Sequence, residues 1–195
     1  MGTLYIGVDV GKEGAWVALD EKGNLVDRMV TPKIASSTDV DVMKQYKWIQ
    51  TMLNKPYDKF HLSLEDVHAI KGTSSKSTSS FMENKGQIYA LFVASAAYRT
   101  DVSIHMIKPK EWQKKVWQSY DKVYLAGKVD TKSTSLNCAK RLWPNDNFYQ
   151  NEDKYSNGKY KCSVPHDGIV DSMLIAEASR PVSYTHLRAH ETLSD

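Results

Sequence analysis

The stretch Leu4–Thr31, LYIGVDVGKEGAWVALDEKGNLVDRMVT, decides the fold of this 195-residue chain. Apolar and polar residues alternate there in three short runs, Leu4–Val10, Ala15–Asp20 and Leu25–Thr31, and such alternation is typical of half-buried strands. Glycine-containing turns separate the runs, and the second turn has the composition of a tight hairpin loop. The stretch therefore predicts an antiparallel meander of three strands.

Two more strands and two helices are expected in the middle of the chain. The segment Val42–Leu53 repeats apolar residues at helical spacing until Pro56 interrupts it. His61–Val67 and Val102–Ile107 have the composition of strands, and Phe81–Tyr98 between them has the pattern of a buried helix. These elements extend the meander into a larger sheet with helices.

The remaining segments complete an α/β pattern. Lys71–Ser80 is rich in Gly, Ser, Thr and Lys and is expected to be a flexible loop. Helices are expected at Lys110–Trp117, at Thr131–Trp143 and after Pro165, with an irregular surface insertion at Asn145–Ser163. The predicted fold class is α/β: a mixed five-stranded sheet, made of three antiparallel N-terminal strands plus two further strands, flanked by helices.

Composition places the chain among globular proteins, with 41% hydrophobic and 25% charged residues. No apolar run approaches the roughly 18 residues that a membrane helix needs, so no membrane partner is expected. The two cysteines have no CxxC spacing, which fits a reducing compartment and does not predict a zinc site. No basic region precedes the first strand-like run, so no secretory signal is expected, and the expected location is the cytoplasm, of a bacterium or of a host cell if a phage encodes the protein.

The last residues differ in character from the rest. Residues 182–195, VSYTHLRAHETLSD, abandon the preceding helical pattern and look like translated sequencing-adaptor sequence. We therefore expect one domain over residues 1–181, followed by a non-native tail.

Positive charge is concentrated between Lys108 and Arg141. The chain as a whole carries a formal charge of +3, whereas this segment holds nine Lys or Arg against three acids. Aromatic residues are interleaved with the lysines, among them Trp112 and Tyr124. Such a segment could follow a phosphate backbone, or it could be an ordinary solvated surface.

Four carboxylates are candidates for a metal site. Asp9 and Glu65 lie in apolar runs, where an ionised group is costly unless it is paired or bound to metal. Period-two alternation puts Asp66 on the opposite side of its strand from Glu65. Asp167 and Asp171 are four residues apart and share one helix face. Together such acids could hold two Mg²⁺ or Mn²⁺ ions about 3.5–4 Å apart; alternatively, they cap helices or pair with lysines.

Five ordered blocks resemble the RuvC-like Holliday junction resolvases of phages and bacteria, which are crossover junction endodeoxyribonucleases of the RNase H-like superfamily. The blocks are residues 6–23 (IGVDVGKEGAWVALDEKG), 64–81 (LEDVHAIKGTSSKSTSSF), 108–117 (KPKEWQKKVW), 132–144 (KSTSLNCAKRLWP) and 166–178 (HDGIVDSMLIAEA). The resemblance implies an RNase H-like fold, a homodimer, branched DNA such as a four-way junction as substrate, and Mg²⁺ or Mn²⁺ as cofactor.

The resemblance also implies a set of metal ligands. Asp9, Glu65 and Asp171 match the metal-binding acids of these enzymes. The fourth ligand of many relatives lies three residues before the final Asp, where this chain has Gly168. Asp167 could substitute from the adjacent position, or His166 could serve as ligand or catalytic base.

DNA contacts are implied for a further group of residues. Lys108 lies in a basic block that the resemblance places near the scissile DNA, where its charge could stabilise the transition state. His68 occupies a position at which relatives carry a base-contacting side chain. The residues expected to contact DNA are His68, Lys71, Ser74, Ser75, Lys76, Lys108, Lys110, Lys114 and Lys115.

Two alternatives of other classes remain open from the sequence alone. The first is a branched-DNA-binding protein without catalytic activity, which metal-dependent nicking of labelled junctions would exclude. The second is a phosphotransferase of the actin-like fold, suggested by the motif DVGKEG, which ATP turnover would reveal. A proofreading-type exonuclease fits less well, because Gly11 stands where such enzymes carry a second acid.

Overall fold

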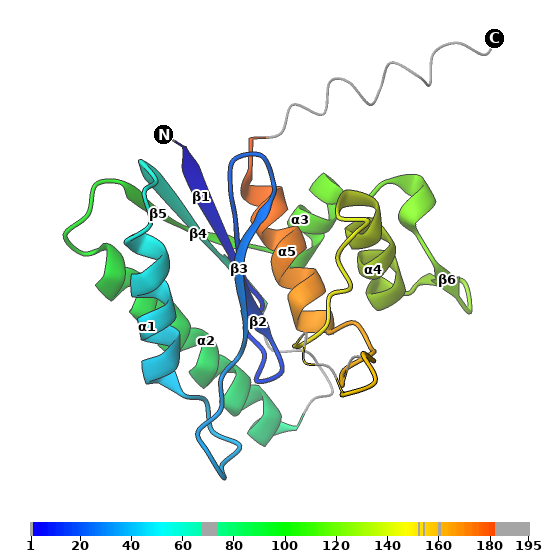
Figure 1. The fold of residues 1–195 in the computed structure, drawn as a ribbon, viewed down its shortest axis with the longest axis horizontal. Helices are drawn as coiled ribbons and strands as arrows, with labels where there is room; N and C mark the ends of the chain where they lie inside the picture. Colours follow the sequence, from blue (N-terminus) through cyan, green and yellow to red (C-terminus); the bar gives the residue numbers. More distant parts are fainter. Residues whose placement is uncertain (1, 68–73, 152, 154, 160, 182–195) are drawn as a thin grey trace.

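A computed structural model describes residues 2–67, 74–151, 153, 155–159 and 161–181 (Figure 1). It contains a five-stranded sheet in the order β3-β2-β1-β4-β5. The strands are β1 (Thr3–Val8), β2 (Ala15–Leu19), β3 (Leu25–Val30), β4 (Lys59–Glu65) and β5 (Val102–Ile107). β2 is antiparallel to β1 and β3, whereas β4 is parallel to β1 and to β5. The predicted mixed α/β sheet is confirmed.

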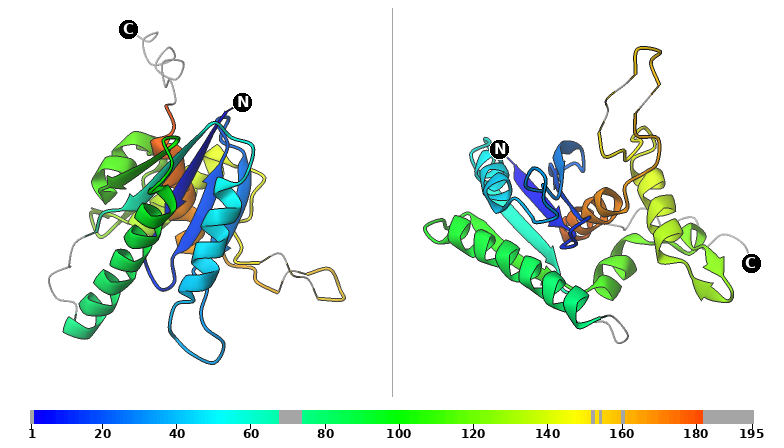
Figure 2. Two further views of the ribbon diagram at one scale, coloured as in Figure 1. Left: turned by 90° about the vertical axis from the view of Figure 1, so that its left-hand side faces the viewer. Right: turned by 90° about the horizontal axis from the view of Figure 1, so that it is seen from below.

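Helices cover both faces of this sheet. They are α1 (Val42–Leu53), α2 (Ser75–Ala96), α3 (Pro109–Val116), α4 (Thr131–Leu142) and α5 (Asp167–Ser179). α1 and α2 lie on one face, and α5 lies on the other with α3 and α4 packed against it (Figures 1 and 2). The two hydrophobic cores are therefore separated by the sheet.

Side-chain alternation along β1 and β4 determines which residues point to each face of the sheet. One set of residues packs in the core beneath α1 and α2: Leu4, Ile6, Val8, Phe60, Leu62 and Leu64. The intervening positions face α5, because successive side chains of a strand point to opposite faces. Glu65, at the end of β4, accordingly belongs to the α5 side.

A glycine in β1 lets α5 approach the sheet closely. A Cβ atom at Gly7 would lie 2.3 Å from the carbonyl oxygen of Ser172 and 2.4 Å from the amide nitrogen of Ala176. Any other residue would therefore push the helix away from the strand. This contact sets the distance between α5 and β1.

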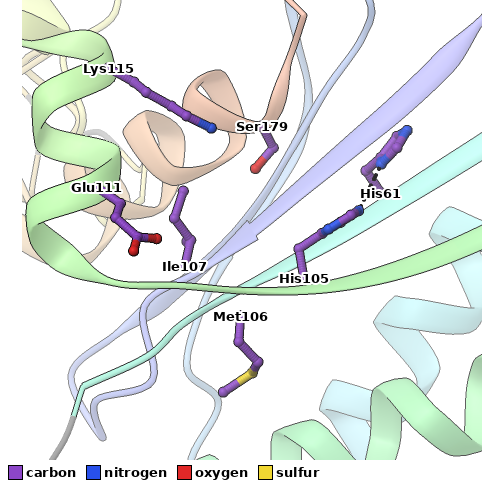
Figure 3. A pocket seen from close by; sticks show the side chains of 7 residues that line it. All are labelled: His61, His105, Met106, Ile107, Glu111, Lys115 and Ser179. Carbon is purple, nitrogen blue, oxygen red and sulfur yellow. Dashed lines mark hydrogen bonds between the residues drawn. The ribbon is translucent and has the colours of Figure 1, made fainter.

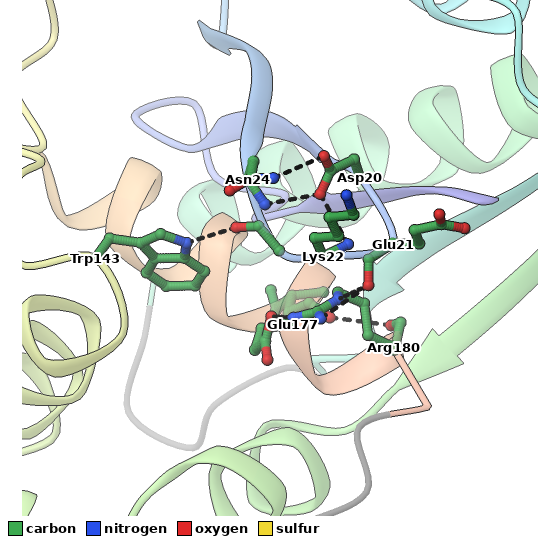
Figure 4. A network of polar contacts seen from close by, with 10 residues as sticks. Asp20, Glu21, Lys22, Asn24, Trp143, Glu177 and Arg180 are labelled. Carbon is green, nitrogen blue, oxygen red and sulfur yellow. Dashed lines mark hydrogen bonds and ion pairs between the residues drawn. The ribbon is translucent and has the colours of Figure 1, made fainter. Parts of the chain in front are cut away.

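The C-terminal end of α5 is tied to the turn between β2 and β3 (Figure 4). The guanidinium Nη2 of Arg180, just after the helix, donates to the carbonyl oxygen of Glu21 at 2.9 Å. Trp143 Nε1, after α4, donates to the carbonyl oxygen of Gly23 at 2.8 Å. The carboxylate of Asp20 accepts two backbone N–H groups within this turn. The turn thus holds α4 and α5 in place on the sheet.

The predicted loop at Lys71–Ser80 is partly wrong, because α2 already begins at Ser75. The amide of Thr78 donates to the carbonyl oxygen of Ser74 at 3.0 Å, which opens the helix. Ser and Thr cost a helix only a few tenths of a kcal/mol each, roughly, so the packed helix from Phe81 onward can extend through them. The polar composition of residues 71–80 therefore did not show where α2 begins.

A small hairpin between α3 and α4 was not expected from the sequence. It follows the short helix η1 (Ser119–Asp121) and consists of β6 (Tyr124–Leu125) and β7 (Lys128–Val129). Its turn residues Ala126 and Gly127 have φ values of 48° and 75°. Positive φ at both central positions is typical of a type I′ hairpin, which Gly favours and Ala does not. The strands are too short for alternation to reveal them.

Two strand ends differ slightly from expectation, since β1 ends at Val8 rather than Val10 and β4 ends at Glu65 rather than Val67. Asp9 therefore follows the strand instead of lying within it.

The expected tail 182–195 and the predicted DNA contacts His68 and Lys71 lie outside the described residues, and the domain boundary at residue 181 stays a prediction. Within the described ranges, no helix is long and apolar enough to cross a membrane.

Candidate active site

The ends of two neighbouring parallel strands bring two acids together. Val8 of β1 pairs with Leu64 of β4, so Asp9 and Glu65 come next to each other where the pairing ends. The amide of Asp9 also donates to the hydroxyl oxygen of Ser172 at 3.0 Å. Asp171, the preceding residue of α5, is thereby held beside the same strand ends. The structure brings Asp9, Glu65 and Asp171 to one place.

The three carboxylates repel one another in a poorly solvated site. Burial raises the pKa of Asp9. Burial also raises the pKa of Glu65 to about 7, against the opposing effect of a hydrogen bond, with repulsion from Asp9 adding to the rise. Burial and repulsion from Asp9 raise the pKa of Asp171 to about 7 as well. Among the described residues, no Lys, Arg or His forms an ion pair with any of these three carboxylates.

A hard divalent cation fits this donor set by type and charge. The three side chains offer only carboxylate oxygens, which Mg²⁺ and Mn²⁺ prefer. In the part of the chain that the structure describes, however, no three His, Cys, Asp or Glu side chains are grouped tightly enough to hold one ion as they stand. Binding an ion would require these carboxylates to turn toward a common point.

Two neighbours of the carboxylates were not foreseen from the sequence. The buried indole of Trp112 donates from Nε1 to Glu65 Oε1 at 2.8 Å. The buried hydroxyl of Ser135 makes a hydrogen bond to Asp171. Both residues lie in blocks that were interpreted for their lysines, 108–117 and 132–144. Trp112 fixes one oxygen of Glu65 and leaves the other free to bind.

Asp167, in the first turn of α5, lies in a different environment from Asp171, one turn later. The side chain of Asp167 is 59% exposed and pairs with Lys132 Nζ at 2.6 Å. A Cβ atom at Gly168 would lie 2.8 Å from the backbone of Glu13 and of Gly14. This backbone therefore admits no carboxylate at position 168, and whether Asp167 is a ligand stays a prediction.

His166 occupies the N-cap of α5 and is half-buried. Burial lowers its pKa. Its Nδ1 atom is buried and has no hydrogen-bond partner among the residues that the structure describes. The imidazole is thus mostly neutral near pH 7, as a ligand or a base must be, and either role stays a prediction.

Comparison with known proteins gives a fold but no sequence family. No protein-family model matches the chain, and no curated protein matches it. The Thermus thermophilus RuvC structure is similar with a TM-score of 0.50 at 10% identity, covering 90% of this chain and 92% of that one. The fold is RuvC-like. T. thermophilus RuvC in complex with Holliday junction substrate matches with a TM-score of 0.49 at 8% identity, covering 90% and 91%.

On this RuvC-like fold, Lys108 lies at the same sheet edge as the acids. It follows Ile107, which pairs in register with Glu65, and it forms the N-cap of α3. Of the predicted DNA contacts in this block, it is the one nearest along the chain to Ile107, the residue paired with Glu65. Its contact with DNA stays a prediction.

The other lysines of the predicted basic block do not form one patch. Lys110 and Lys114 line a pocket on one side of α3. Lys115 instead donates to the carbonyl oxygen of Ala178 at 3.3 Å and lines a different pocket of about 310 Å³ (Figure 3). His61 and His105 lie in that second pocket with ring nitrogens 3.2 Å apart. Helix α3 therefore divides the block between two surfaces.

The raised pKa of Glu65 predicts a pH dependence of stability. The proton on Glu65 contributes stability that is fully present below its ordinary pKa of 4.5 and is lost as pH rises through about 7. The metal-free protein should therefore lose stability relative to Glu65→Gln between about pH 5 and pH 8, by on the order of 2 kcal/mol. Urea unfolding midpoints in EDTA check this, and parallel pH profiles for the two proteins would contradict it.

Proposed function

We propose that this protein is a structure-selective endonuclease that resolves Holliday junctions or other branched DNA by divalent-metal-dependent phosphodiester hydrolysis. The observation that carries the proposal is the meeting of Asp9, Glu65 and Asp171 at one sheet edge. The RuvC-like fold supports it. A group of mutually repelling carboxylates is suited to binding a divalent cation such as Mg²⁺.

In the proposed site, Asp9, Glu65 and Asp171 hold Mg²⁺ or Mn²⁺, with two ions per site and Asp167 as a further ligand. When bound, such ions activate a water molecule and stabilise the leaving oxygen of a phosphodiester. Trp112 orients Glu65 by its hydrogen bond, and Ser135 orients Asp171. Such supporting hydrogen bonds typically change metal affinity or activity by about 10–100-fold when removed.

Two nearby residues complete the proposed chemistry. The ammonium group of Lys108 offsets the repulsion between the acids and an incoming phosphate. His166, held neutral by its lowered pKa, accepts a proton near the reacting phosphate. Both roles depend on the bound DNA reaching the edge of the sheet where β5 ends.

Cleavage of a panel of labelled DNAs tests the proposal. Four-way, three-way, flap and linear duplex DNAs are incubated with the protein in Mg²⁺, in Mn²⁺ and in EDTA. We expect metal-dependent cuts in branched DNA and little cutting of the linear duplex. Equal cutting of all four DNAs would contradict the proposed selectivity for branched structures. No cutting under any metal condition would overturn the nuclease assignment.

One observation favours the alternative of a non-catalytic junction-binding protein. The carboxylates of the described residues are not preassembled as a ligand group. The same panel separates the two functions, because such a protein would retain four-way junctions in a gel shift and leave them intact in both metals.

A homodimer is the proposed assembly, and the outer face of α2 is the proposed contact. Met82, Tyr89 and Val93 are 42%, 45% and 44% exposed there, an unusual apolar stripe for a solvent-facing helix. Gly86 and Ala90 lie exposed between them. Small residues within such a stripe permit the close approach of a second helix.

A charge placed in this stripe is expected to dissociate the dimer. Tyr89→Glu should weaken self-association at least about 30-fold, since a buried interface tyrosine commonly contributes about 2 kcal/mol. Tyr155→Glu, at an exposed tyrosine of the irregular insertion, is the matched control. Sedimentation velocity over a range of concentrations measures both; a wild-type monomer, or equal dissociation by both variants, would speak against this interface.

A further inference from the structure

A basic pocket of about 410 Å³ lies between α3 and the first turn of α4, apart from the carboxylates. The polar and aromatic side chains that line it are Lys110, Gln113, Lys114, Trp117, Lys122 and Thr131. Trp117, Lys122 and Thr131 lie in the basic segment 108–141, but none of them was singled out from the sequence as a DNA contact. The pocket joins side chains from three separate segments of the chain, so its composition was not visible in any one motif.

The three lysines of the pocket carry uncompensated charge. In the described ranges, Lys110, Lys114 and Lys122 have neither an ion pair nor a side-chain hydrogen bond. The acids that flank this region in sequence are already engaged. Asp121 pairs with Arg141 at 2.9 Å, and Asp130 accepts the hydroxyl of Ser133. The three lysines therefore favour an anionic ligand in this pocket.

Neutral hydrogen-bond donors accompany the lysines. Thr131 is the first residue of α4, and Asp130 at the N-cap makes no side-chain cap hydrogen bond within the described structure. The N–H groups of that first turn are thus uncapped, and helix N-termini favour negatively charged groups. These N–H groups, with the Gln113 amide, suit the oxygens of a phosphate.

The pocket lies across α3 from the carboxylate site, and the first turn of α4 also lines it. Trp112, on α3, contacts Glu65, whereas Lys110 and Lys114 of the same helix line the pocket. On α4, Ser135 contacts Asp171 while Thr131 lines the pocket. The two sites share α3 and α4 as walls, so a DNA arm that extends past α3 from the carboxylates would bring a backbone phosphate to the pocket.

We propose that this pocket binds a backbone phosphodiester of the DNA arm that leaves the carboxylate site. The inference rests on the proposed function, since it assumes that DNA is the substrate. Exposed aromatic residues beside the pocket favour a nucleic acid over a free phosphate ion. Tyr120 and Tyr124 are 68% and 61% exposed and are available to contact sugars or bases.

The salt dependence of DNA binding tests the pocket. Binding of a four-way junction is measured in EDTA for the wild type, Lys122→Gln, and the double variant Lys110→Gln with Lys122→Gln. The slope of log affinity against log salt should fall by about one for each lysine that no longer neutralises a phosphate. Affinity near physiological salt should fall several-fold for the single variant and further for the double variant.

Lys128→Gln is the matched control, because Lys128 lies in the neighbouring hairpin and does not line the pocket. Its slope and affinity should equal those of the wild type. Unchanged slopes for the two pocket variants, or an equal loss for Lys128→Gln, would overturn the proposal. Strong competition by inorganic phosphate alone would also overturn it, in favour of a small-anion site. Because binding is read in EDTA, a failure of cleavage does not affect the result.

Discussion

Asp9→Asn is expected to reduce metal-dependent cleavage of a four-way junction at least about a thousand-fold, equivalent to about 4 kcal/mol. Asn keeps the size of the side chain but removes the charge that binds the cation. Asp9 follows β1 and raises the pKa of both Glu65 and Asp171, so it is the acid shared by the whole cluster. Junction binding in EDTA should be retained or strengthened, because one negative charge near the DNA is removed.

The matched control for this variant is Asp58→Asn, at an exposed acid just before β4. It makes the same chemical change away from the cluster and should leave cleavage at the wild-type rate. Single-turnover cleavage in Mg²⁺ and gel-shift binding in EDTA are the two measurements. Wild-type cleavage by Asp9→Asn would mean that the site lies elsewhere.

Gly7→Ala should be strongly destabilising despite the small size of the substitution. Its Cβ atom would lie 2.3 Å from the backbone oxygen of Ser172, so α5 must move away from β1. Overpacking of this kind commonly costs about 1–3 kcal/mol, and a backbone obstacle puts the expected loss at the upper end. At about 2–4 °C per kcal/mol, the melting temperature should fall by about 6–12 °C.

Gly86→Ala provides the opposite case within the same chain. Among the described residues, no atom lies within 4 Å of a Cβ at this exposed position of α2. Replacing a helical Gly by Ala there should raise the stability of the single protomer by about 0.5–1 kcal/mol, measured in the Tyr89→Glu background in which the proposed α2 contact is disrupted. Calorimetry of both variants checks the pair. A Gly7→Ala protein as stable as the wild type would show that α5 does not pack on β1 as described.

The sheet and two of the three clustered acids could be predicted because strand patterns are local. The alternation of β4 placed Glu65 and Asp66 toward opposite faces of the sheet. The salt bridge between Asp66 and Lys85 Nζ at 2.6 Å, on the α2 side, agrees with that prediction. A period-two pattern carries this information in the sequence itself.

The distinction between Asp167 and Asp171 could not be predicted in the same way. Their spacing puts both on one helix face, but the difference arises from contacts distant in sequence. Lys132 of α4 engages Asp167, and the backbone around Gly14 fills the space beside Gly168. The hydrogen bond from Trp112 to Glu65 likewise joins α3 to β4 and leaves no local pattern.

Crystals of the protein soaked in Mn²⁺ and measured at an anomalous wavelength would show where the ion binds. We expect an anomalous peak about 2.2 Å from carboxylate oxygens of Asp9, Glu65 and Asp171, between the usual distances for Mg²⁺ and Ca²⁺. The peak should disappear in Asp9→Asn. Mn²⁺ bound elsewhere, with these three side chains still apart and without an ion, would contradict a shared metal site and the nuclease function proposed from it.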